Sequence, residues 1–205
     1  LDAVINGYCL NTALQQYGEI IPIPGDKIVE VGEGDTLYLE NRAFEFWDAP
    51  GHANHHVFIR DTKSKSIFTG DTFGVSYRQM DTTNGAFAFI SSTPSQFNPD
   101  EAQKSIRRIM NSDAQTVFLT HYSKLANIDY AGNSLLRLVD DYVNIAEASL
   151  ISEDVSKNLE KSLKKLLFQR AYSHGVAISD KGLNDILDLD IKLNASGLIT
   201  WLERK

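Results

Sequence analysis

The chain has 205 residues, of which 42% are hydrophobic and 10% aromatic, enough for one core with a small helical appendix. Its net charge of −7 argues against a nucleic-acid partner, because proteins that bind phosphate backbones carry basic patches. The single Cys9 excludes an intramolecular disulfide framework, and no apolar run reaches the roughly eighteen residues of a membrane span. We therefore expect a cytoplasmic protein with no nucleic-acid or membrane partner.

Short apolar runs broken by turn residues fill 19–120, which predicts strands with few helices. The first run, 19–24, contains two prolines, so we expect an edge strand. Alternating residues across 27–47 predict an antiparallel meander. Residues 57–59 and 66–68 predict a hairpin that ends on Thr-Gly-Asp.

A helix is predicted over 98–110, with Asn98 as its N-cap and Pro99 at its first position. It runs into a buried strand that ends at His121, as in a layered α/β domain. Between the hairpin and this helix, 74–97 shows no clear period, and we interpret it as a long functional loop.

The composition then divides the chain into an α/β domain over 1–132 and a helical tail over 133–205. Apolar residues at helical spacing predict three tail helices and a short fourth capped by Asn194; the first three lie around 135–146, 155–167 and 183–187.

Three strand-like segments end in a residue that can bind metal: His52, Asp71 and His121. Strand ends are held rigidly while their loops reach a common cleft, so distant residues can converge on one ion. Imidazole and carboxylate together suit zinc, iron or manganese better than calcium. Gly51 and Gly70 precede two of these residues and suit tight turns or close backbone approach.

Taken one at a time, these residues also have ordinary structural explanations. His52 could be a surface or capping residue, Thr-Gly-Asp is a common turn, and His121 could be a satisfied core residue. His55 and His56 are expected to begin the next strand with side chains on opposite faces. A structural role is favoured; the alternatives are that one of them supports a metal ligand through a hydrogen bond or itself substitutes as a ligand.

The ensemble is more specific than its parts. Pro-Gly-His at 50–52, Thr-Gly-Asp at 69–71 and Thr-His at 120–121, in this order, resemble the metallo-β-lactamase superfamily. The resemblance covers 19–122 and looks closest to glyoxalase II-like hydrolases, with "GDTFGVSYRQ" and a helical tail. It implies that this α/β chain is the C-terminal part of an αββα sandwich.

One departure concerns the family's early His-x-His-x-Asp-His motif, which is missing because His52 is the first histidine. We therefore expect a fragment of a larger protein, rather than a relative that has lost its metal site. The N-terminal portion of the same protein, carrying the remaining ligands, is the implied partner.

By this resemblance the complete protein holds two divalent metal ions, with zinc favoured over iron or manganese. His52 and His121 would each ligate one ion, and Asp71 would bridge both as the catalytic residue. A hydroxide shared by the ions would attack a small ester-like substrate: a thioester, lactone or phosphoester. The fragment alone is expected to bind metal weakly or not at all and to be inactive.

Substrate contacts are expected from the segment after Asp71. Tyr77, Arg78 and Tyr122 are the substrate-binding candidates. Arg78 could contact an anionic group or pair with Asp81, and Tyr122 could donate to an oxyanion or pack. The helical tail is expected to cover the pocket or to form a homodimer contact.

Two other function classes remain open at this point. One is a di-iron redox protein on the same scaffold, although the tail is too short for a flavin domain. The other is a non-catalytic interaction module that retains the fold.

Overall fold

The computed structural model describes residues 18, 21–92, 96–122 and 124–205. They belong to two compact units, Leu1–Val31 and Gly32–Lys205.

The described part of the first unit contains one short 3-10 turn, η1 (Gly25–Lys27). The strand predicted over 19–24 is wrong for residues 21–24, and its first two positions lie outside the described residues. Its prolines remove backbone donors that a ladder needs. Residues 28–31 also pair with no strand in the described chain. The alternation of apolar and polar residues there is therefore not sufficient to form a strand without a pairing partner.

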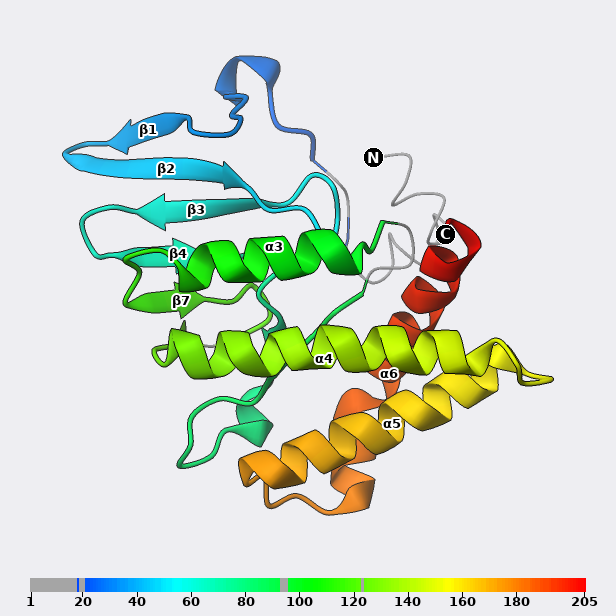
Figure 1. Cartoon of the computed structure of the whole chain (residues 1–205). Coiled ribbons are helices and arrows are strands. Elements are labelled where there is room, and N and C mark those ends of the chain that lie inside the picture. The colour runs from blue at the N-terminus through cyan, green and yellow to red at the C-terminus, as the bar shows by residue number, and fades with distance from the viewer. Residues whose placement is uncertain (1–17, 19–20, 93–95, 123) are drawn as a thin grey trace. The chain divides into compact units, whose positions relative to one another are not determined.

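The second unit contains a six-stranded sheet in the order β1-β2-β3-β4-β7-β8 (Figure 1). Only β4 and β7 pair in parallel; the other neighbours are antiparallel. The predicted meander and hairpin are therefore confirmed from residue 36 onward. The strands are β1 (Thr36–Leu39), β2 (Arg42–Asp48), β3 (Val57–Asp61), β4 (Ser66–Phe68), β7 (Thr116–Phe118) and β8 (Lys124–Leu125).

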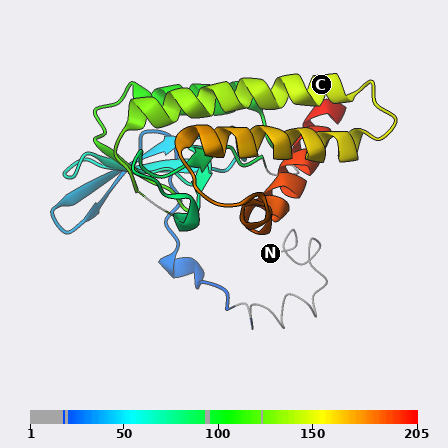
Figure 2. The ribbon, with the colours of Figure 1, turned by 90° about the horizontal axis from the view of Figure 1, so that it is seen from below.

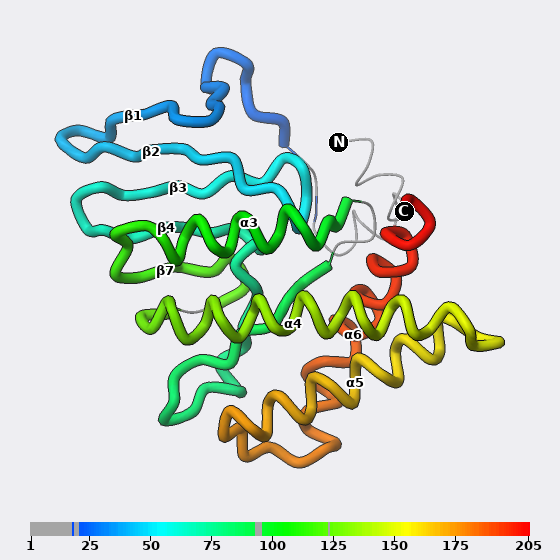
Figure 3. The backbone as a smooth tube through the Cα atoms, viewed as in Figure 1, coloured from blue at the N-terminus to red at the C-terminus, as the bar shows by residue number. Residues whose placement is uncertain are grey.

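The described part of the segment 74–97 contains three short regular elements. It holds β5 (Val75–Ser76), η2 (Arg78–Met80) and β6 (Ala88–Phe89), and β5 and β6 form a small second sheet. Its phenylalanines are buried in the common core, and β6 contacts a tail helix. Figure 3 traces the backbone of the chain through this region. The segment is largely irregular, as predicted, although buried apolar side chains fix it in the core. A functional role for it stays a prediction.

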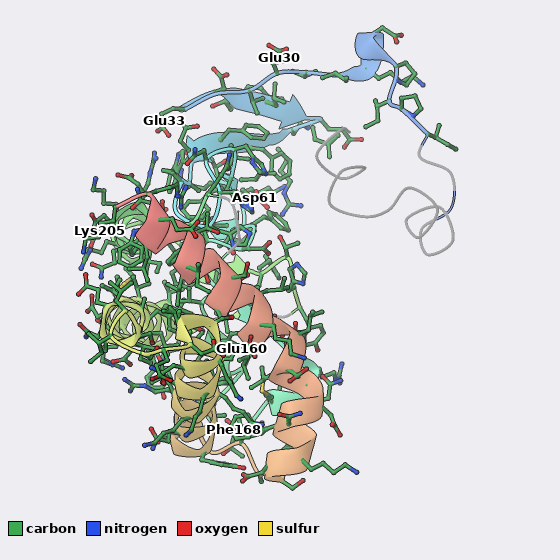
Figure 4. The ribbon with its side chains drawn as sticks, turned by 90° about the vertical axis from the view of Figure 1, so that its right-hand side faces the viewer. Glu30, Glu33, Asp61, Glu160, Phe168 and Lys205 are labelled. Atoms are coloured by element: carbon green, nitrogen blue, oxygen red, sulfur yellow. The ribbon has the colours of Figure 1, made fainter. Side chains whose placement is uncertain are left out.

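Four α-helices follow: α3 (Pro99–Met110), α4 (Ile128–Ser149), α5 (Val155–His174) and α6 (Asp180–Glu203). The predicted cap of α3 is confirmed, since the Asn98 side chain accepts from the amides of Asp100 and Glu101. Helix α4 packs against α3, α5 and α6, and Figure 2 shows α4 and α5 alongside each other. Helices α5 and α6 also pack together, as Figure 4 shows, where Phe168 marks α5. None of the helices in the described chain is long and apolar enough to cross a membrane.

Helix α6 is continuous where the sequence predicts two helices. Ser179 caps its start, and Leu187, Ile191 and Leu198 keep one buried stripe through it. Asn194 lies inside this stripe, almost fully buried, so its prediction as an N-cap was wrong. Its side chain bonds to a distant segment instead of to its own helix.

The two faces of the six-stranded sheet differ. One face packs under α3, where the Arg108 guanidinium lies 4.6 Å from the centre of the Trp47 ring. The opposite face is apolar but open: Leu39 is 67% and Phe68 44% exposed. We call it the outer sheet face, and its apolar residues line a shallow groove of about 490 Å³: Leu37, Leu39, Phe44, Phe46, Ile59 and Phe68.

Candidate metal centre

The ends of β2, β4 and β7 meet at one edge of the sheet, because β4 is parallel to β7 and both β2 and β4 are antiparallel to β3. His52, Asp71 and His121 follow these ends. His52 Nε2 lies 3.5 Å from Asp71 Oδ2, and His121 Nε2 lies 3.8 Å from Asp71 Oδ1. The structure thus brings the three residues together, and metal binding by them stays a prediction.

The turn that carries His52 is fixed against α3. Gly51 has a φ of +133°, and a Cβ there would lie 2.4 Å from the Cα of Ala102. The hydroxyl of Ser105 donates to the carbonyl of Pro50 over 2.7 Å. A residue with a side chain at position 51 would therefore force the turn and α3 apart.

The His52 ring is buried and oriented from both sides. Its Nδ1 lies 2.8 Å from the carbonyl oxygen of Ser91, which can only accept a hydrogen bond. The bond therefore requires a proton on Nδ1 and leaves the Nε2 lone pair on the side of Asp71. This is the arrangement in which an imidazole serves as a metal ligand through Nε2.

Asp71 presents a buried carboxylate oxygen, Oδ1, that accepts no hydrogen bond from any residue the structure describes. Buried polar atoms normally have a partner, so this oxygen suits a ligand that the protein alone does not supply. His52, His56 and Asp71 each offer one ligand atom, all within 4.8 Å of one another. The donor set fits zinc, iron or manganese.

His56 is closer to this group than the sequence indicated. It precedes β3 together with His55, and their rings are 5.4 Å apart rather than on opposite faces. The His56 ring stands edge-on to His52 at 4.8 Å. Burial first, and then the neighbouring His52, lower the pKa of His56, which favours the neutral form that can ligate metal. Gly70 makes room, because a Cβ there would lie 2.4 Å from His56 Nδ1.

His121 and Tyr122 lie on the exposed side of the group. The His121 side chain is 55% exposed, and its carbonyl accepts from the amide of Ser76 over 3.0 Å. Arg78 donates to the Tyr122 hydroxyl at 3.2 Å and forms no ion pair with Asp81 within the described chain. Two of the three substrate-binding candidates therefore contact each other next to His121.

Tyr77, the third candidate, is tied to the C-terminal helix. Its hydroxyl donates to both carboxylate oxygens of Asp190 in α6, at 3.0 and 3.2 Å. Burial, and then Asp190, raise the pKa of Tyr77 to about 12. Burial also raises the pKa of Asp190, against the opposing effects of Tyr77 and His121. Sequence reasoning missed Asp190, which carries no local motif.

A comparison with known proteins identifies the family. The family model described as the metallo-beta-lactamase superfamily matches residues 6–121, more than half of the chain. The chain belongs to the metallo-beta-lactamase superfamily, whose members are typically metal-dependent hydrolases. The sequence-based assignment of the superfamily and of an α/β fold with a helical C-terminal segment is confirmed.

Solved structures show the same fold. A metallo-beta-lactamase family protein from Thermus thermophilus is 12% identical, with a TM-score of 0.56, over 99% of this chain and 60% of that one. An archaeal metallo-beta-lactamase superfamily protein from Sulfolobus tokodaii is 18% identical, with a TM-score of 0.57. The match covers 97% of this chain and 61% of that protein. The chain thus spans about 60% of the length of these two proteins. No curated protein matches its sequence.

Proposed function

We propose that this chain supplies part of the metal centre of a hydrolase acting on small ester-like molecules. The observation that carries the proposal is the Asp71 carboxylate, whose buried Oδ1 lacks a hydrogen-bond partner among the described residues while Oδ2 faces His52. An imidazole and a carboxylate at one sheet edge, with His56 within reach, form a donor set that divalent zinc prefers.

In this proposal some residues of the chain bind metal and others bind substrate. Two divalent ions held there would supply Lewis-acid activation of water and of a carbonyl or phosphoryl oxygen. Asp71 turns one oxygen towards His52 and the other towards His121, which suits a carboxylate shared between two ligand groups. Arg78 and Tyr122 are placed to bind a polar or anionic part of a thioester, lactone or phosphoester.

We further propose that the remaining ligands belong to another segment of the same protein. Two observations support this: the chain spans about 60% of the length of its structural neighbours, and the outer sheet face is apolar yet exposed. A sheet normally buries its apolar face against a further layer. The chain alone is then expected to bind metal weakly and to lack hydrolase activity.

A zinc titration followed by thermal unfolding tests the ligand set. Zinc should raise the melting temperature of the wild-type chain, and His52→Gln or Asp71→Asn should abolish that increase. His56→Gln and His121→Gln then show which histidine completes the group. His55→Gln is the matched control, because His55 is an exposed neighbour outside the group and should behave as wild type. A wild-type melting temperature that does not respond to millimolar zinc would contradict the proposal.

A further inference from the structure

Asn194 in α6 holds the backbone on both sides of Ser91. Its Oδ1 accepts from the amide of Ser92 at 2.7 Å and from the hydroxyl of Ser92 at 3.0 Å. Its Nδ2 donates to the carbonyl of Ile90 at 3.1 Å and to the hydroxyl of Tyr142 at 3.2 Å. The residue is 1% exposed, so all of these bonds lie in the core.

Packing in the core does not explain why residue 194 is an asparagine. The neighbouring members of the buried stripe of α6 are apolar: Leu187, Ile191 and Leu198. A buried amide is destabilising unless its donors and acceptors are satisfied, whereas an apolar residue would fill the space without that requirement. The role of Asn194 in the core is therefore to form hydrogen bonds, which a leucine side chain could not form.

The segment it holds contacts the candidate metal centre. The carbonyl of Ser91, between the two residues that Asn194 binds, accepts from His52 Nδ1. We infer that Asn194 is a positioning residue for His52: through Ser92 and Ile90 it holds the Ser91 carbonyl where it keeps the proton on Nδ1. The inference rests on the proposed function, in which His52 ligates metal through Nε2.

Loss of the Asn194 amide should change the tautomer of His52. Without it, the Ser91 carbonyl is no longer tied to α6 and can move away from Nδ1. The Nε2–H tautomer then becomes populated, and that tautomer has no lone pair on Nε2 for a metal. This effect is independent of any bound ion, so it can be measured on the chain as it is.

The experiment is ¹⁵N NMR of the imidazole nitrogens at pH about 8.5, where an ordinary histidine with a pKa of about 6.5 is neutral. His52→Gln identifies the His52 signals by their loss. In the wild type we expect His52 to be mainly the Nδ1–H tautomer. In Asn194→Ala the ratio of Nδ1–H to Nε2–H should fall about fivefold, which equals about 1 kcal/mol, the usual net value of one hydrogen bond.

Leu187→Ala is the matched control, since it loosens α6 at a buried apolar position without removing a hydrogen bond to 90–92. It should leave the tautomer ratio unchanged. An unchanged ratio in folded Asn194→Ala, or an equal fall in Leu187→Ala, overturns the inference. If Asn194→Ala does not fold, Ser92→Ala decides: it removes the hydroxyl bonds and keeps the amide bond, so a smaller fall of at least about twofold is expected, and no change overturns the inference.

The zinc titration separates this inference from the proposed function. A tautomer shift in Asn194→Ala together with no zinc response in the wild type would leave the positioning role intact and reject metal binding. A zinc response in the wild type with no tautomer shift in Asn194→Ala would support metal binding and reject the positioning role.

Discussion

Individual residues determine how closely the segments of the candidate centre approach. Gly70 is the sharpest case, because it has a φ of +54° and no room for a Cβ beside the His56 ring. Gly70 directly precedes Asp71 in the chain and lies against the His56 ring in space. The position therefore constrains two ligand candidates, Asp71 and His56. Glycine is required here by a neighbour as well as by the backbone.

We expect Gly70→Ala to lower the free energy of unfolding by about 2–3 kcal/mol, the sum of left-handed strain and a steric clash. Gly34→Ala is the control: its φ is +84°, but a Cβ there meets nothing within 4 Å. It should lower the free energy by only about 1 kcal/mol. Urea unfolding measures both, and equal losses would show that contact with His56 does not matter.

Asp190 should make stability depend on pH. Burial raises its pKa above the unfolded value of about 3.9, so the folded chain binds the proton more tightly than the unfolded chain. The ionised carboxylate therefore lowers stability above its folded pKa, and this loss is relieved as the pH falls through that value.

Asp190→Asn should accordingly stabilise the chain at pH 7 and have a smaller effect near pH 4. The asparagine oxygen can still accept from Tyr77. Asp188→Asn, at an exposed position of the same helix, provides the comparison and should show no such stabilisation. Urea unfolding at a series of pH values decides, and an Asp190→Asn effect that does not vary with pH would contradict the assignment.

At the level of elements, the sequence predicted correctly those helices and strands that are determined by adjacent residues. The cap and proline of α3 and the alternation of β1 to β4 predicted those elements because caps and strand periodicity are properties of adjacent residues. The order of strand ends likewise predicted that His52, Asp71 and His121 would come together. The approach of His56 was left as an alternative, because its ring position depends on Gly70.

The errors arose where tertiary partners decide. Residues 21–24 and 28–31 have a strand-like sequence but form no strand. Asn194 looks like a cap, yet its partners are Ser92 and Tyr142, which no nearby sequence indicates. Asp190 was missed for the same reason, since its role depends on a hydrogen bond from Tyr77.

The contact between α4, β6 and α6 depends on Tyr142. Its hydroxyl donates to the carbonyl of Ile90 and accepts from Asn194, and the side chain is fully buried. We expect Tyr142→Phe to lower the free energy of unfolding by about 1–2 kcal/mol, the effect of losing buried hydrogen bonds. Tyr172→Phe, at a half-exposed site, should change it by less than about 0.5 kcal/mol. Thermal or urea unfolding distinguishes the two, and similar effects would mean that the buried bonds contribute little.

At the scale of the whole molecule, the outer sheet face of the 32–205 unit is apolar and exposed. A chain with this apolar face open should associate with itself when nothing else covers it. We expect Leu39→Lys with Phe68→Lys to raise the dissociation constant of self-association at least tenfold in sedimentation experiments. Ile151→Lys replaces another exposed apolar residue, 94% exposed between α4 and α5, and should have no effect. A wild-type chain that stays monomeric at high concentration would show that the face needs no partner.

The bond between Ser92 and Asn194 joins residues 102 positions apart. Synthesis proceeds from the N-terminus, so His52 and its neighbours emerge long before the residue that fixes the Ser91 carbonyl exists. The orientation of this histidine is therefore completed only after α6 has been synthesised and has packed against the segment around Ser92. A nascent chain stalled within α6, or a product truncated before residue 194, would carry every ligand candidate and still lack the oriented His52.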